Sequence, residues 1–177
     1  MQRLASCGID QDSTIIIWNW KKGSILAKSS GHQEKVFDLQ FNPFVENGLV
    51  SCGVKQISFW TLTGNTLSKK KGLFGNTKDI QTMFCVAFSK QKDVYYTGTL
   101  NGQVYVWKGN QLEEILPGVH NGSVFTITAL PDGFISGGKD GIIRTWDTNF
   151  SPIETIEIKH LINLYDKAGN FHTEGNY

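Results

Sequence analysis

Two histidines could act as general bases in this chain, because an imidazole changes its charge close to neutral pH. They are His32 and His120, and each comes just before an expected strand, which favours a structural hydrogen bond. The adjacent carboxylates Glu113 and Glu114 lie on another expected strand. Neighbours on a strand point to opposite faces, so these two cannot serve as an acid and base pair. We therefore expect no enzyme.

Other motifs for catalysis or metal binding do not occur in the sequence. It contains no Gly-x-Ser-x-Gly elbow and no phosphate-binding glycine loop. The three cysteines form no Cys-x-x-Cys pair, and an odd number does not suggest a disulfide framework. Cys7 and Cys52 stand in matching Ser-Cys-Gly triplets, which favours buried packing. We expect no catalytic residue, no cofactor and no metal ion.

Charge and hydropathy also limit the partners. Lysine and arginine number 17 against 16 aspartates and glutamates, and the net charge of +1 gives no general attraction to nucleic acid or to an anionic membrane. No run of 18 apolar residues is present, and the N-terminal residues show no signal-peptide pattern. We expect a cytoplasmic protein with neither a nucleic-acid nor a membrane partner.

Four tryptophans divide the chain into an internal repeat. Trp18, Trp60, Trp107 and Trp146 follow one another at intervals of 42, 47 and 39 residues, and each ends a short run of alternating apolar and β-branched residues. A period of about 40 to 45 residues with four strands is the signature of a WD40-type β-propeller blade. Each blade can bury its faces only against its neighbours. The predicted fold class is therefore all-β.

The repeat also predicts the domain organisation. The expected blades lie near residues 2–29, 36–70, 82–116 and 124–158. The first of them lacks its innermost strand, so we expect three complete blades and one partial blade in an open arc, as an incomplete propeller spanning residues 1–158. Residues 159–177 abandon the pattern and are expected to form a flexible C-terminal tail.

The fourth blade carries polar residues that resemble the WD40 hydrogen-bonded network. In that pattern, hydrogen bonds join a histidine before the first strand, a serine or threonine in the second, an aspartate in the next turn and the tryptophan of the third. The corresponding residues here are His120, Ser136, Asp140 and Trp146. The resemblance implies that these four side chains form a structural network.

Blades three and one keep only parts of this pattern. Blade three has Thr97 and Trp107, but Asn101 stands in place of the aspartate and no histidine is in register. An amide cannot stabilise a partly charged imidazole as a carboxylate does. In blade one the turn is longer, and the network carboxylate is either Asp10 or Asp12, depending on the end from which residues are counted.

Blade two has His32 and Trp60 but no aspartate between them in the expected turn. This turn is one residue shorter than its counterpart in blade four, so Val54 or Lys55 takes the carboxylate position. His32 must then find another acceptor, because an unpaired buried donor costs about 1 to 3 kcal/mol.

Residues 56–74 carry a Phe-Trp strand end, a glycine turn, a basic outer strand and a Gly-Leu-Phe step. In this order of features the segment resembles the echinoderm microtubule-associated protein-like (EMAP-like) family. Residues 84–88 and 98–107 are similar to the next repeat of those proteins. The resemblance spans residues 2–158, about nine-tenths of the chain.

Members of that family bind microtubules or tubulin. The resemblance thus implies a partial chain of a non-catalytic WD-repeat protein that functions in microtubule binding and cytoskeletal organisation, with tubulin as its partner and a cytoplasmic, cytoskeletal location. The alternative is a generic WD40 scaffold or adaptor that mediates protein–protein interactions through the propeller surfaces.

The candidate tubulin-binding patch is a local basic cluster made of Lys69, Lys70 and Lys71, with Lys78 a little further on. One interpretation is a salt-sensitive site for the acidic tubulin surface and its glutamate-rich tails. The other is a solvated outer strand that lysines protect against edge pairing. The connection at residues 72–76 is longer than its equivalents, and inserted loops of repeat proteins often carry binding.

Overall fold

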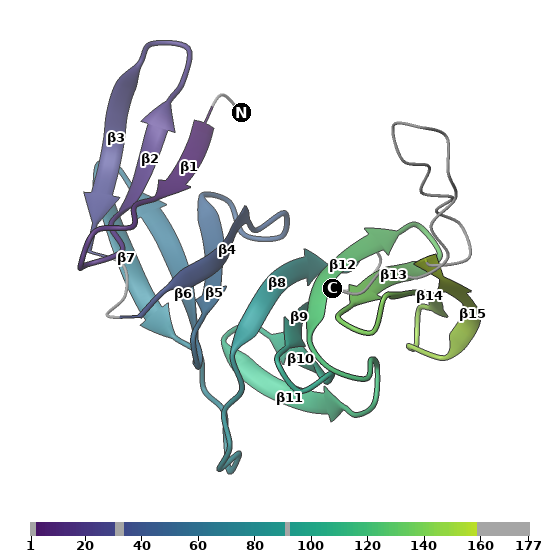
Figure 1. The fold of residues 1–177 in the computed structure, drawn as a ribbon. Helices are drawn as coiled ribbons and strands as arrows, with labels where there is room; N and C mark the ends of the chain where they lie inside the picture. Colours follow the sequence, from purple (N-terminus) through teal and green to yellow (C-terminus); the bar gives the residue numbers. More distant parts are fainter. Residues whose placement is uncertain (1–2, 31–33, 91–92, 159–177) are drawn as a thin grey trace, which may run out of the picture.

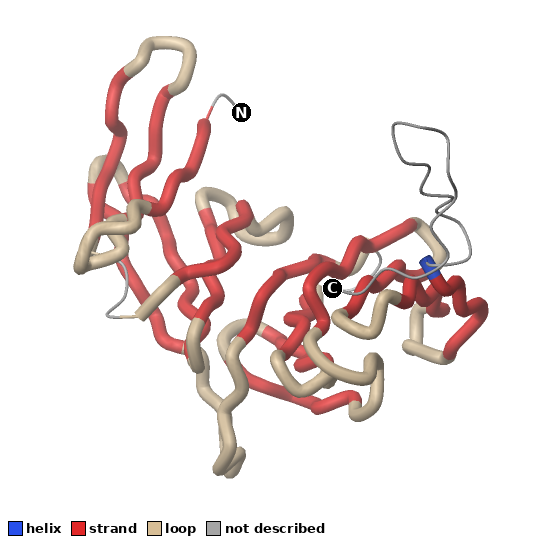
Figure 2. The backbone as a smooth tube through the Cα atoms, viewed as in Figure 1, coloured by secondary structure: helices blue, strands red, loops and turns tan. Residues whose placement is uncertain are grey.

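Four antiparallel sheets follow one another along the chain in an open row, as Figure 1 shows for the computed structural model. The structure describes residues 3–30, 34–90 and 93–158. Figure 2 shows strands and connecting loops through nearly all of this part. One sheet has three strands and three have four, which confirms the predicted all-β fold class with three complete propeller blades and one partial blade. The expected tail at 159–177 lies outside the described residues and stays a prediction.

We call the sheets blades one to four in chain order. Within each blade, strands that are consecutive in sequence are also neighbours in the sheet. The strands are β1 (Arg3–Cys7), β2 (Ile15–Asn19) and β3 (Ser24–Ser29) in blade one; β4 (Val36–Phe41), β5 (Gly48–Gly53), β6 (Gln56–Thr63) and β7 (Thr66–Lys71) in blade two; β8 (Met83–Phe88), β9 (Tyr95–Thr99), β10 (Val104–Lys108) and β11 (Gln111–Leu116) in blade three; and β12 (Val124–Leu130), β13 (Gly133–Gly138), β14 (Ile142–Asp147) and β15 (Pro152–Glu157) in blade four.

Tight glycine turns set the register of the outer strands. Gly64 and Gly109 each begin a two-residue hairpin turn, and their φ angles are +59° and +58°. Such positive angles match the turn to the twist of the flanking strands, and glycine adopts them without steric cost. These turns fold β7 onto β6 and β11 onto β10, so that each outer strand lies in a fixed register.

The hydrophobic core lies between the blades. One cluster packs blade one against blade two and includes Ile17 and Trp60. A second joins blades two and three and includes Trp107, and a third joins blades three and four and includes Trp146. Trp60 and Trp107 are at most 1% exposed. The tryptophan repeat therefore marks the positions where neighbouring blades bury each other's faces.

The innermost strands carry an aromatic strip across the row. In β4, β8 and β12 a bulge inserts one extra residue into the pairing, and that residue is Phe37, Phe84 or Phe125. The ring centroids are 5.1 Å apart for the first pair and 5.4 Å for the second. A hydrogen bond of 2.8 Å from the Val86 N–H to the Asp38 carboxylate also ties β8 to β4. These contacts hold the inner edges of successive blades together.

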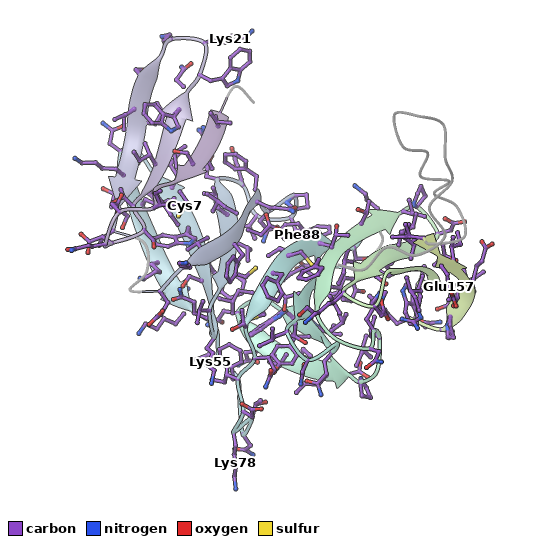
Figure 3. The ribbon with its side chains drawn as sticks, viewed as in Figure 1. Cys7, Lys21, Lys55, Lys78, Phe88 and Glu157 are labelled. Carbon is purple, nitrogen blue, oxygen red and sulfur yellow. The ribbon has the colours of Figure 1, made fainter. Side chains whose placement is uncertain are left out.

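The connection after β7 packs onto blade three. Leu73 donates to the Asn110 carbonyl at 2.8 Å and accepts from the Leu112 N–H at 2.9 Å, so it extends the sheet beyond β11. The Phe74 ring lies edge-on to Trp107, with the centroids 5.1 Å apart. Figure 3 places Lys78 at the far end of this connection, away from the sheets.

Candidate functional site

Every repeat tryptophan donates its indole N–H to a hydroxyl oxygen on the neighbouring strand. The four pairs are Trp18 with Ser6 at 2.8 Å, Trp60 with Ser51 at 2.8 Å, Trp107 with Thr97 at 3.1 Å, and Trp146 with Ser136 at 2.8 Å. A buried indole N–H without an acceptor would cost about 1 to 3 kcal/mol. This pair is therefore the polar element that all four blades share, whatever else surrounds it.

Blade four adds a histidine and an aspartate to this pair. The His120 Nε2 atom lies 2.7 Å from the Ser136 hydroxyl, and Nδ1 lies 2.9 Å from Asp140 Oδ1. Because the Asp140 carboxylate can only accept, Nδ1 carries the ring proton and donates to it, which leaves Nε2 of a neutral imidazole to accept from the Ser136 hydroxyl. Burial lowers the pKa of His120 despite the opposing effect of Asp140. The imidazole is therefore neutral near pH 7.

Asp140 is the centre of the network. Its carboxylate accepts hydrogen bonds from the Asn121 N–H at 3.0 Å and the Ile142 N–H at 3.2 Å, and it pairs with Arg144 at 3.2 Å. Burial alone would raise the pKa of Asp140, but the hydrogen bonds from Asn121 and His120 hold it below its usual value. Arg144 also donates to the Val119 carbonyl at 2.8 Å. The donors and acceptors of the network are therefore hydrogen-bonded to one another, as expected for a structural clamp.

Arg144 is a member that the sequence reasoning missed. It stands four residues after Asp140 on β14, the strand that carries Trp146, and its side chain reaches the carboxylate and the loop before β12. The available signal was a cation on the third strand at the residue pairing with Ser136. A strand neighbour of the network serine is placed to close the ring of contacts.

Asn101 occupies a different environment in blade three. Its Oδ1 atom lies 2.8 Å from the Thr99 hydroxyl, and the Thr99 oxygen accepts from the Gln103 N–H at 3.0 Å. The next residue, Gly102, has φ +84° and accepts the His120 N–H of blade four at 3.1 Å. Local hydrogen bonds thus stabilise the Asn101 turn, and the backbone of this turn contacts the next blade.

Asp10 organises the corresponding turn of blade one. Its Oδ1 atom accepts from the Asp12 N–H at 3.0 Å, the Thr14 N–H at 3.1 Å and the Thr14 hydroxyl at 3.2 Å. The hydrogen bond from the Thr14 backbone is the main cause that lowers the pKa of Asp10. Of the two carboxylates that the sequence left open, Asp10 is the one that holds this turn.

An open groove of about 720 Å³ lies beside the β5–β6 turn of blade two. That turn has only two residues, Val54 and Lys55, and Lys55 has φ +52°. Lys55, Lys69 and Lys71 all line the groove. The carboxylates Asp12 and Glu34 belong to the same lining. We call this hollow the lysine groove. His32, which the sequence assigns to blade two, lies outside the described residues.

Strand alternation divides the basic cluster. Lys69 pairs with Trp60, which faces blade one, whereas Lys70 pairs with Phe59, which packs toward blade three. Lys71 shares the face of Lys69, since side chains two residues apart on a strand point the same way. The structure therefore brings Lys69 and Lys71 together with Lys55 in the groove. Lys70 and Lys78 are not among the residues that line it.

Lys69 lies in a partly desolvated position. Its ammonium is 5.3 Å from the centroid of the Trp60 ring, a cation–π contact. Burial lowers the pKa of Lys69, and the neighbouring charge of Lys71 lowers it further. Two lysines thus repel each other along one side of the lysine groove, and a bound anion would relieve that repulsion.

The cysteines are placed for packing. Cys52 and Cys85 are buried, whereas Cys7, which was also expected to be buried, is half-buried against the core between blades one and two. Burial raises the pKa of the Cys85 thiol to about 12. Such a thiol stays protonated at neutral pH and is a poor nucleophile and metal ligand. In the part of the chain that the structure describes, no three His, Cys, Asp or Glu side chains gather closely enough to hold a metal ion. Nor does that part contain a helix with the length and apolar character to cross a membrane.

Comparisons with known proteins point to one family. Residues 1–171 match the family model described as echinoderm microtubule-associated protein first beta-propeller. The chain is similar to echinoderm microtubule-associated protein-like 1 of Mus musculus, with 36% identity over 86% of this chain and 19% of the relative. For echinoderm microtubule-associated protein-like 2 of Rattus norvegicus the values are 35%, 86% and 24%. The 77 kDa echinoderm microtubule-associated protein of Lytechinus variegatus is 30% identical over 88% of this chain and 24% of its own length.

Proposed function

Since the chain belongs to the echinoderm microtubule-associated protein family, we propose that it is a non-catalytic part of a microtubule-binding protein and contacts tubulin through the lysines of blade two. The family resemblance of residues 56–74 is confirmed by the match over residues 1–171. The curated relatives are named as microtubule-associated proteins, and this chain spans 19% to 24% of their length. Because the chain is only part of such a protein, we infer microtubule binding from the surface of this part alone.

The observation that carries the proposal is the gathering of Lys55, Lys69 and Lys71 along one groove. The whole chain has a net charge of only +1, so this is a local basic surface in a nearly neutral protein. Local complementarity of this kind steers association with an acidic partner and weakens as salt screens it. An acidic tubulin surface has the required charge, and the proposed location is accordingly cytoplasmic, on microtubules.

We propose no catalytic role for the His120–Asp140 network of blade four, because its acid–base groups are hydrogen-bonded to one another. His120 is 3% exposed, and both its ring nitrogens have partners within the blade. A general base must reach a substrate proton, either directly or through one water. His120 cannot do so without breaking the contacts that hold its own turn.

A second candidate is a scaffold that binds other proteins, and the aromatic strip of the inner strands favours it. Phe37 is 44% exposed and Phe125 is 50% exposed, although the first makes a tilted and the second an edge-on ring contact with Phe84. Exposed aromatic side chains in a row are typical anchors of protein–protein contacts. Binding by this strip would depend little on salt, whereas binding by the lysines would depend on it strongly.

Co-sedimentation of the purified chain with stabilised microtubules across a salt series tests the proposal. We expect saturable binding that fades as salt rises and that falls by about tenfold in the double variant Lys69→Glu, Lys71→Glu, because two attractions become repulsions. Sizing before each run excludes aggregates. Binding that ignores both salt and the double variant would reject the lysine surface in favour of the scaffold, and a monodisperse chain that does not bind would reject microtubule contact by this part.

A further inference from the structure

The corresponding turns of blades four and two differ in their charged residues: the first is Lys139-Asp140-Gly141, whereas the second, Val54-Lys55, has a lysine and no carboxylate. In blade four the turn after the second strand carries Asp140, which is surrounded by donors. In blade two the same turn is one residue shorter and carries Lys55. The place of Arg144, two residues before the repeat tryptophan, is taken by the small Ser58. Where blade four holds an internal anion and its cation, blade two has the open lysine groove.

The spacing of the groove lysines fits an extended peptide. Lys69 and Lys71 lie two residues apart on β7, which separates their Cα atoms by about 7 Å along the strand. Side chains at alternate positions of any extended peptide repeat at this same spacing, so two carboxylates at alternate positions can meet both lysines. Lys55 provides a third cation to the lining from the β5–β6 turn. A volume of about 720 Å³ also lies in the range of ligand sites, about 300 to 1,000 Å³.

The two carboxylates of the lining narrow the choice of ligand. Asp12 and Glu34 belong to the groove together with the three lysines, so its net charge is small. A long polyanion such as nucleic acid would meet these carboxylates as well as the lysines. A short segment with separated acidic side chains can place individual charges against Lys69 and Lys71, at the spacing that β7 sets. The groove is therefore better matched to an acidic peptide than to a continuous polyanion.

We propose that the lysine groove of blade two binds an extended acidic peptide whose carboxylates lie at alternate positions and contact Lys69 and Lys71, with Lys55 as a third contact. This inference rests on the proposed function in assigning the peptide to a glutamate-rich segment of tubulin. The incoming carboxylates take the place, in blade two, of the anion that Asp140 provides in blade four. The mutual repulsion of the two β7 lysines is relieved at the same time.

Fluorescence anisotropy with two labelled peptides tests the groove directly. One peptide has glutamates at alternate positions separated by serines, and its control has glutamines in their place. We expect the 177-residue chain to bind the glutamate peptide with salt-sensitive affinity and to bind the glutamine peptide at least about tenfold more weakly, since only the first is charged. Equal binding of the two peptides, or no binding of either by a folded chain, would overturn the proposal.

The strand supplies its own matched control. Lys71→Glu should weaken glutamate-peptide binding by about tenfold or more, while Lys70→Glu, one residue away on the opposite face, should change it by less than about twofold. Both side chains are exposed, so both variants should keep the fold, which circular dichroism and tryptophan fluorescence check. Lys71→Gln provides a milder second variant. Equal losses of peptide affinity in Lys70→Glu and Lys71→Glu would show that only the overall charge matters and would overturn the assignment of the peptide to the lysine groove.

Parallel measurements separate this inference from the proposed function. If the peptide binds with the expected variant pattern but microtubules do not, the groove stands and the tubulin assignment fails. If microtubules bind but Lys70→Glu and Lys71→Glu weaken binding equally, the tubulin assignment stands and the groove fails. Tighter binding of a single-stranded nucleic acid than of the glutamate peptide, through the same lysines, would overturn the choice of an acidic peptide.

Discussion

Blades four and two start from the same pair, a buried tryptophan that donates to a serine, and differ in what surrounds it. In blade four the turn supplies a carboxylate, and the polar groups around it are satisfied within the blade. In blade two the turn supplies a lysine beside an open groove. The repeat therefore specifies the fold through the tryptophan and serine, while the turn is free to become either a clamp or a binding surface.

The largest effect is expected when the clamp of blade four is broken. Asp140→Ala leaves the Nδ1–H of His120, the Asn121 N–H and the Arg144 guanidinium without their shared acceptor. We expect a loss of about 2 to 4 kcal/mol in the free energy of unfolding, because the buried imidazole of His120, the half-buried Arg144 guanidinium and the Asn121 N–H lose one charged partner at once. Urea denaturation followed by tryptophan fluorescence measures it.

Asn101→Ala in blade three is the matched control for that substitution. Asn101 contacts the Thr99 hydroxyl, which also bonds to Gln103, so its loss should cost no more than about 1 kcal/mol. Equal changes for the two substitutions would mean that Asp140 has no special part in holding its blade, and the contrast between the turns would lose its energetic basis.

A second, smaller effect should come from pH. Burial lowers the pKa of His120 in the folded state, so the unfolded state binds a proton more readily once the pH falls below the ordinary value of 6.5. Stability that is fully present above that value is then lost as the pH falls, at no more than about 1.4 kcal/mol per pH unit for one proton. The lowered pKa of Asp140 acts in the same direction below pH 3.8.

The test is the difference between the wild type and His120→Gln in urea denaturation between pH 7.5 and pH 5.5. His120→Gln is less stable at pH 7.5 but should lose less stability as the pH falls through the range in which a free imidazole titrates, about pH 6.5. Identical pH profiles would show that His120 titrates alike in both states, contrary to its burial.

Sequence reasoning went furthest where a pattern repeats. The tryptophan spacing and the strand alternation depend on local chain geometry, and the all-β blades followed from them. Asn101 and Asp10 show the limit, because their partners Thr99 and Thr14 are set by the conformation of each turn. A periodic pattern predicts which face a residue takes, but the hydrogen bonds of an irregular turn depend on angles that no pattern specifies.

The basic cluster shows a second limit. Read along the chain, Lys69, Lys70 and Lys71 form one run, yet the pairing of β7 with β6 sends the middle one to the opposite face. Lys55 lies fourteen residues earlier in the sequence and joins the groove only because β5 and β6 are linked by a tight turn. Tertiary placement therefore decides which charges act together.

The smallest effect should come from the blade-two turn itself. Lys55 has φ +52°, a conformation that asparagine adopts more readily than lysine, so Lys55→Asn should change the free energy of unfolding by no more than about 0.5 kcal/mol. The same substitution removes one of the three groove cations and should weaken the binding of the glutamate peptide by about threefold. Urea denaturation and anisotropy on one preparation measure both quantities. A stability loss as large as that of Asp140→Ala would show that the blade-two turn is a clamp like that of blade four.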